Sequence, residues 1–231
     1  MMIEAILWDN DGLLLDTESV FFDLTRERFS DCGIELTEEF WSREYLGNAR
    51  SSREIAALLG MAPSMVAPLL ERRNTQYLEL IGRSVAVRPQ VRETLEALSG
   101  RVRLAMVTGS PRSQIHTMHL QSGLLDYFEV IVTDDEVDNP KPHPEPYLKA
   151  LDLLGVAPGA ALAVEDSLRG FASAEAAGIA CVVVPNRLTR LQCFHRAFAV
   201  EKSVSGVLKH LKGPVSPVEP VLPKPVINTI I

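Results

Sequence analysis

Apolar residues fall in short, unbroken runs along much of the chain, and each run has the length of a strand. Five such runs are rich in valine, isoleucine, leucine and alanine, at residues 5–8, 103–108, 129–133, 161–164 and 180–184. Polar residues do not alternate with the apolar ones, so each run is expected to be buried on both faces, as parallel strands are when helices cover their sheet. The pattern therefore predicts a parallel sheet that contains these five strands.

Helical patterns alternate with the later strands. They cover residues 91–98, 113–121, 144–154 and 167–177, and a glycine follows closely after each of them. The third begins with Pro144 and ends before Gly155, an arrangement that proline and glycine favour at the two ends of a helix. Alternation of this kind predicts a doubly wound α/β sheet, with helices on both faces of a three-layer α/β/α core.

A purely helical block interrupts this alternation between the first two strands. Its helices are expected at residues 19–32, 38–45, 51–59 and 63–81, with glycines between them. A helical block in this place is typical of an inserted cap domain, although a helical extension packed on the core is the simpler interpretation. The predicted core then covers residues 1–16 and 84–213, and the cap covers 17–83. Closely spaced prolines predict an extended or disordered tail at 214–231.

Composition and charge exclude several classes of protein. The 231 residues are 46% hydrophobic and 23% charged, which rules out collagen-like, coiled-coil and wholly disordered chains. A formal net charge of −7 disfavours binding to nucleic acid or to an anionic membrane. No apolar run approaches the roughly 18 residues of a membrane span, and the N-terminus lacks the pattern of a signal peptide. The three cysteines form no C-x-x-C pair, so a cytoplasmic protein without disulfides is expected.

Acidic pairs follow two of the predicted strands. Asp9 and Asp11 flank Asn10 after the first strand, and Glu165 and Asp166 end the fourth. The carboxyl ends of parallel strands share one edge of a sheet, where ligands bind, so these carboxylates are expected to meet. Turn formation and helix capping are the alternative explanations. Clustered carboxylates repel one another unless a cation lies among them, and oxygen ligands without histidine or cysteine favour Mg²⁺ over zinc.

Two further segments supply groups that bind anions. Thr108, Gly109 and Ser110 follow the second strand, where a hydroxyl and backbone amides at the start of a helix can hold a phosphate. Taken alone, this segment is better explained by ordinary capping of a helix by serine or threonine. Lys141 lies between prolines after the third strand, and a rigid loop can fix an ammonium group as a point charge for a phosphate.

Taken in order, these segments resemble the four motifs of the haloacid dehalogenase superfamily. The motifs stand here as DNDG from Asp9 to Gly12, Thr108, KPHP from Lys141 to Pro144, and the pair Glu165 and Asp166. Four motifs in register are a far stronger signal than any one of them. The resemblance implies a Rossmann-like core with an inserted α-helical cap, of the type found in the β-phosphoglucomutase-like branch.

The resemblance also implies a role for each residue. Asp9 would be the nucleophile that forms an aspartyl-phosphate, and Asp11 would be the acid and base for the leaving group and for water. Mg²⁺ would be bound by Asp9, the backbone carbonyl of Asp11, and Asp166, with Glu165 in support. Thr108, Gly109, Ser110 and Lys141 would hold the phosphoryl oxygens, and Arg50 in the cap is a candidate specificity residue.

The sequence departs from the mutase pattern at two cap positions. The expected histidine aligns near Phe21 and the expected lysine near Glu79. We therefore expect a Mg²⁺-dependent phosphatase that acts on a small phosphorylated metabolite, a sugar or polyol phosphate. A hexose-phosphate mutase and a phospho-accepting receiver module remain as alternatives, the latter because Asp134 and Asp135 follow the third strand. The oligomeric state is left open.

Overall fold

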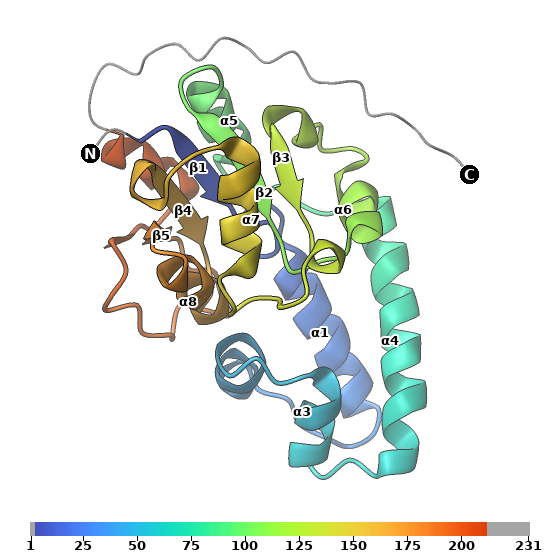
Figure 1. The fold of residues 1–231 in the computed structure, drawn as a ribbon. Coiled ribbons are helices and arrows are strands. Elements are labelled where there is room, and N and C mark those ends of the chain that lie inside the picture. The colour runs from blue at the N-terminus through green and yellow to red at the C-terminus, as the bar shows by residue number, and fades with distance from the viewer. Residues whose placement is uncertain (1–2, 212–231) are drawn as a thin grey trace.

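A computed structural model describes residues 3–211 and contains one six-stranded sheet with parallel pairing throughout (Figure 1). The strand order is β3-β2-β1-β4-β5-β6. The strands are β1 (Ala5–Trp8), β2 (Arg103–Val107), β3 (Val130–Val132), β4 (Ala161–Glu165), β5 (Ala180–Val183) and β6 (Ala199–Val200). Each of the five apolar runs contains one strand, so the expected α/β sheet is confirmed. The tail predicted at 214–231 lies outside the described residues.

The sixth strand was not predicted from the sequence. β6 has two residues and pairs with β5 at the edge of the sheet. Its second residue, Val200, is 54% exposed. Two residues with only partial burial produce no periodicity, so the pattern of apolar residues could not identify this strand.

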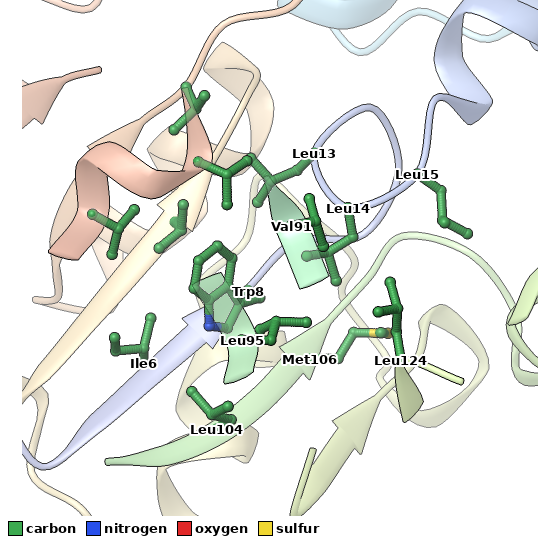
Figure 2. Packing of buried hydrophobic residues seen from close by; sticks show 14 of the residues in the cluster. Ile6, Trp8, Leu13, Leu14, Leu15, Val91, Leu95, Leu104, Met106 and Leu124 are labelled. Carbon is green, nitrogen blue, oxygen red and sulfur yellow. The ribbon is translucent and has the colours of Figure 1, made fainter. Parts of the chain in front are cut away.

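Helices cover both faces of the sheet. Successive residues of a strand point to opposite faces, so alternate residues contact different helices. Ile6 and Trp8 of β1 point to the face covered by α5 (Val91–Leu98) and α6 (Arg112–His119), as Figure 2 shows for Trp8 against Val91 and Leu95. Ala5 and Leu7 point to the opposite face, covered by α7 (Glu145–Leu154) and α8 (Leu168–Ala176). All four strand residues are fully buried, which explains the unbroken apolar runs.

The helical block between β1 and β2 has a hydrophobic cluster of its own. It contains α1 (Thr17–Ser30), α2 (Glu38–Trp41), the π-helix η1 (Ser42–Gly47), α3 (Ser52–Leu58) and α4 (Pro63–Arg83). Phe22, Phe29, Trp41 and Ile55 are at the centre of the cluster, and Leu188 joins it from the core. Figure 1 shows α1, α3 and α4 grouped together below the sheet. A separate cluster supports the cap interpretation over a helical extension, while the exact domain boundaries stay a prediction.

Local sequence explains where the cap helices begin. The Thr37 hydroxyl accepts a hydrogen bond from the Phe40 amide, and Ser51 and Glu54 form a reciprocal capping box at the start of α3. The predicted helix at 38–45 is divided into α2 and η1, and Trp41 and Tyr45 stack there with ring centroids 4.0 Å apart. Within residues 3–211, no helix combines the length and the apolar character that crossing a membrane requires.

Candidate active site

The carboxyl ends of β1 and β4 bring the first and last acidic pairs together. The two strands are direct neighbours, with Trp8 opposite Val164. The Asp9 amide extends this pairing by donating a hydrogen bond to the Val164 carbonyl at 3.0 Å. Asp9, Glu165 and Asp166 are all buried, and one carboxylate oxygen from each lies within 4.8 Å of the others. The structure thus brings together three of the four carboxylates that were expected to meet, and the Asp11 carboxylate is not one of them.

Lys141 joins two members of this cluster from the loop after β3. Its Nζ donates to Asp9 Oδ1 at 2.7 Å, to Glu165 Oε1 at 2.6 Å and to the Val107 carbonyl at 2.8 Å. All three ammonium protons are therefore used within the protein. Burial lowers the pKa of Lys141, but the charges of Asp9 and Glu165 outweigh burial and raise it above its ordinary value. The ammonium stays charged and binds the nucleophile candidate directly.

The acidic cluster carries more negative charge than Lys141 can offset. Burial, with the charge of Glu165 next in importance, raises the pKa of Asp9 to about 7. Burial and the charge of Asp9 raise the pKa of Asp166 well above its usual range. The buried Glu165 Oε2 has no hydrogen-bond partner. An unsatisfied carboxylate oxygen beside two further carboxylates fits a hard divalent cation, because all the available donors are oxygens.

Two residues that the sequence analysis did not identify hold Glu165 in place. The Tyr147 hydroxyl donates to Glu165 Oε1 at 2.5 Å. Gly170 in α8 lies so close that a Cβ atom there would be 1.9 Å from Glu165 Oε2. A side chain at position 170 would displace the carboxylate, so the glycine is required by close approach and not by its backbone angles.

Asp11 is held separately by hydroxyl groups. Its Oδ1 accepts a hydrogen bond from Thr17 at 2.8 Å, and its Oδ2 accepts from the hydroxyls of Thr108 and Ser110, both at 2.9 Å. The carboxylate of Asp11 is not part of the cluster formed by Asp9 and its neighbours. The structure therefore brings the predicted loop at 108–110 to the site, where both of its hydroxyls contact the candidate acid–base residue.

Asn186 connects the two acidic segments from the loop after β5. Its Nδ2 donates to Asp166 Oδ2 at 2.6 Å and lies 3.3 Å from the Gly12 carbonyl oxygen. Gly12 has a φ of +79°, and a Cβ atom there would lie 2.4 Å from Asp166 Oδ2. No sequence pattern marks Asn186, although its position after a strand at the same edge of the sheet makes it a reasonable candidate.

A buried histidine supports the segment between Asp9 and Asp11. His119 Nε2 lies 2.8 Å from Asn10 Oδ1, and His119 Nδ1 lies 2.7 Å from the Ser122 hydroxyl. Burial lowers the pKa of His119 from 6.5 to about 4. The neutral ring of His119 therefore holds Asn10 in place from α6.

This burial predicts a pH dependence of stability. The unfolded chain binds a proton at His119 below pH 6.5 and the folded chain does so only near pH 4, so stability falls as the pH drops through this interval. Between pH 7 and pH 5 the wild type is expected to lose about 2 kcal/mol more unfolding free energy than His119→Gln. Denaturant unfolding at both values measures this difference. The exposed His195 provides the control, since His195→Gln should follow the wild type; parallel curves for all three proteins would contradict the prediction.

A cavity of about 390 Å³ opens over these groups and extends to the cap. Its core side includes Asp9, Asp11, Gly109, Ser110, Lys141, Glu165, Asp166 and Arg169, and its cap side includes Glu18, Phe21, Tyr45, Leu46, Asn74, Tyr77 and Leu78. Burial, followed by the charge of Asp11, raises the pKa of Glu18 to about 8. The predicted catalytic carboxylates thus lie at the base of an open cavity.

Two predicted residues do not line this cavity. Thr108 is buried behind it at 2% exposure and reaches the site only through Asp11. Arg50 is directed away, because its guanidinium pairs with Glu44 at 2.9 Å and its side chain is 42% exposed. The structure therefore does not bring Arg50 to the candidate site, in contrast to the role expected from the resemblance.

Comparison with known proteins identifies the family. A family model described as haloacid dehalogenase-like hydrolase matches residues 6–184. The chain belongs to this family. Protein CbbY of Rhodobacter capsulatus is 35% identical over 85% of this chain and 92% of its own length. The phosphorylated carbohydrates phosphatase of Thermotoga maritima is 32% identical over 77% of this chain and 82% of its own.

Solved structures agree with this assignment. The crystal structure of CbbY from Rhodobacter sphaeroides in complex with phosphate superposes with a TM-score of 0.69 at 29% identity, covering 89% of this chain and 96% of that one. A putative β-phosphoglucomutase from Thermotoga maritima superposes with a TM-score of 0.71 at 30% identity, covering 91% of this chain and 100% of that one. This chain is therefore a phosphatase of the β-phosphoglucomutase-like branch. Phosphatases of this family generally use a divalent metal ion, and the cluster of Asp9, Glu165 and Asp166 is suited to bind one.

Family membership removes the receiver-module alternative. Asp134 and Asp135, on which that alternative depended, lie in a short 3-10 helix after β3. Asp135 there accepts hydrogen bonds from the Thr133 hydroxyl and the Arg112 amide, and neither residue belongs to the acidic cluster. Their position is explained by turn formation.

Proposed function

We propose that the protein is a Mg²⁺-dependent phosphatase that hydrolyses a small sugar or polyol phosphate through an aspartyl-phosphate on Asp9. The observation that supports this most directly is the contact of Asp9 with Lys141 at 2.7 Å, in a cluster with Glu165 and Asp166 that opens to a cavity. A carboxylate can approach a phosphate dianion only when nearby positive charge offsets their repulsion. The free cysteines agree with a cytoplasmic location.

The proposed reaction uses the protein's carboxylates in two steps. In the first step, a carboxylate oxygen of Asp9 bonds to phosphorus, the bond from phosphorus to the ester oxygen breaks, and Asp11 donates its proton to the departing oxygen. In the second step, Asp11 takes a proton from water as the water oxygen attacks phosphorus, and the bond to Asp9 breaks to release inorganic phosphate. The hydroxyls of Thr17, Thr108 and Ser110 fix the orientation of Asp11 for both proton transfers.

Asp9, Asp166 and Glu165 would hold Mg²⁺, and the Asp11 carbonyl would be a further ligand. The ion supplies positive charge that offsets the carboxylates and stabilises the negative charge of the transferring phosphoryl group. Lys141 offsets the charge of Asp9 and Glu165 by contacting one carboxylate oxygen of each, so the second oxygen of each is not used by Lys141. Phosphoryl transfer depends chiefly on this positioning and charge balance.

Hydrolysis is favoured over mutase activity by the cap. Phe21, at the position where the mutase pattern has a histidine, lines the cavity with an apolar ring. Glu79, near the expected lysine, is exposed and lies outside the lining. Measuring phosphate release against isomer formation from a hexose phosphate distinguishes the two activities, and isomerisation without release would support the mutase.

Removal of the metal tests the proposal. With a small phosphate ester as substrate, EDTA-treated protein is expected to release phosphate at least about a hundredfold more slowly than protein supplied with Mg²⁺. Restoring Mg²⁺ should restore the rate, and the folded state should persist by circular dichroism in both samples. Full activity of the metal-free protein would refute the proposed metal dependence.

A further inference from the structure

Arg169 is a cation of the cavity that the proposed mechanism does not use. It lies in the first turn of α8 and lines the cavity beside Ser167. Within residues 3–211, its guanidinium forms no hydrogen bond or ion pair with another residue. Arginines near the site elsewhere have fixed partners, since Arg88 donates to the Gly12 carbonyl and Arg112 pairs with Glu136. The Arg169 guanidinium is therefore available to a ligand.

Its position places it next to the loop predicted to bind phosphate. Arg169 Nη2 is 3.7 Å from the position that a Cβ atom on Gly109 would occupy. The guanidinium thus lies along the cavity side of loop 108–110. Arg169 lines the cavity together with Glu18 and Tyr45 of the cap, so Arg169 lies where the core meets the cap.

Lys141 also lines the cavity, but its ammonium group is already bound by the protein. Its three protons are donated to Asp9, Glu165 and the Val107 carbonyl. Within the described lining, Arg169 is therefore the cation whose donors have no partner in the protein and can be directed to a phosphate dianion. A guanidinium is well suited to this task, because its planar donors can contact two phosphate oxygens at once.

The cap side of the cavity has a different character. Phe21 packs against Tyr77 and Tyr45 with ring centroids 5.0 and 5.8 Å apart. Leu46, Leu78 and Asn74 complete that side together with Glu18, and no cation of the cap lines the cavity within residues 3–211. Aromatic rings can pack against the apolar faces of an uncharged leaving group, and an amide can form hydrogen bonds with its hydroxyls. A second anionic group of the substrate would be buried there without a partner.

We infer that Arg169 binds the phosphoryl group that is transferred, from the cap-facing side of loop 108–110, and that the leaving group of the substrate is uncharged. This inference rests on the proposed phosphatase function and assigns its substrate class. Neutral sugar and polyol monophosphates fit the site, whereas bisphosphates and phosphorylated carboxylic acids are selected against.

Variants of Arg169 test the first half of the inference. Arg169→Gln is expected to weaken the binding of inorganic phosphate, measured by calorimetry in the presence of Mg²⁺, by roughly 10- to 100-fold. KM for a hexose monophosphate should rise by a similar factor, and Arg169→Lys should restore part of the loss. The exposed Arg196 gives the control, because Arg196→Gln should change neither value. Unchanged phosphate affinity in a folded Arg169→Gln protein would overturn the inference.

A panel of matched esters tests the second half. The wild type is expected to hydrolyse a hexose monophosphate at least about tenfold more efficiently than the corresponding bisphosphate, and glycerol phosphate at least about tenfold more efficiently than phosphoglycerate. If the wild type preferred the anionic member of each pair and Arg169→Gln lost this preference, Arg169 would bind a second anionic group of the substrate. That result would overturn the inference. Absence of any phosphate release by the wild type would refute the proposed function instead, and the calorimetric measurement would still decide whether Arg169 binds phosphate.

Discussion

Asp9→Asn is expected to lower the rate of phosphate release by on the order of 10⁴-fold or more, because an amide cannot form the aspartyl-phosphate. The change should have little effect on folding. The amide oxygen can still accept the hydrogen bond from Lys141, and the substitution removes one carboxylate from a buried cluster in which burial already raises the pKa of Asp9 to about 7. Phosphate release from a small ester, with and without Mg²⁺, measures the effect.

A matched variant separates this result from a general effect of charge. Asp138 is exposed and lies outside the cavity lining, so Asp138→Asn should retain wild-type activity. Rapid acid quenching should reveal a phosphorylated wild-type protein by intact mass, and no phosphorylated Asp9→Asn protein. Hydrolysis by Asp9→Asn at the wild-type rate would rule out Asp9 as the nucleophile and with it the proposed reaction.

Lys141→Met is expected to reduce both stability and activity. The ammonium compensates Asp9 and Glu165, whose side chains are 9% and 0% exposed. Removing one partner of such a buried pair leaves uncompensated charge, which costs about 3–5 kcal/mol of unfolding free energy near neutral pH. Activity should fall by on the order of 10³-fold, because Asp9 loses its stabilising cation.

The pH dependence of this variant identifies the cause. Without Lys141, the carboxyl groups of the cluster are expected to keep their protons to higher pH in the folded protein than in the unfolded chain. A carboxyl whose folded pKa is raised destabilises the protein as the pH rises above its unfolded pKa. The difference in unfolding free energy from the wild type should therefore be smaller at pH 4 than at pH 7. Lys202→Met, in an exposed position, is the control, and an equally stable Lys141→Met protein at pH 7 would contradict the prediction.

The pattern of apolar residues was sufficient to predict the strands that are buried on both faces. The runs that contain β1 and β4 are unbroken because helices cover both faces of the sheet, and their boundaries were predicted to within one residue. β6 could not be predicted in this way, because an edge strand of two residues shows no periodicity. The helix predicted at 38–45 continues through η1, whose π-helical hydrogen bonding leaves no mark in the pattern of apolar residues.

The residues of the candidate site also form two groups, those that the sequence predicted and those that it did not. Asp9, Asp11, Lys141, Glu165 and Asp166 were identified because each follows or ends a strand at the same edge of the sheet, and the structure brings them together. The residues that support them were missed. Tyr147, Gly170, Asn186 and His119 contact the site from helices and loops distant in the chain. A tyrosine or glycine within a helix looks the same in sequence whether or not it touches a carboxylate.

The pattern of residues along the chain was enough to predict the parallel sheet, the helical insertion and the order in which the candidate catalytic residues follow the strands. These features depend on periodicity and on residues close together in the chain, which a sequence records directly. The packed molecule was needed to show that Arg50 pairs with Glu44 outside the cavity, whereas Arg169 lines it. The direction of a long, charged side chain depends on which acceptors the fold places around it, and those acceptors come from segments whose proximity is a property of the packed molecule.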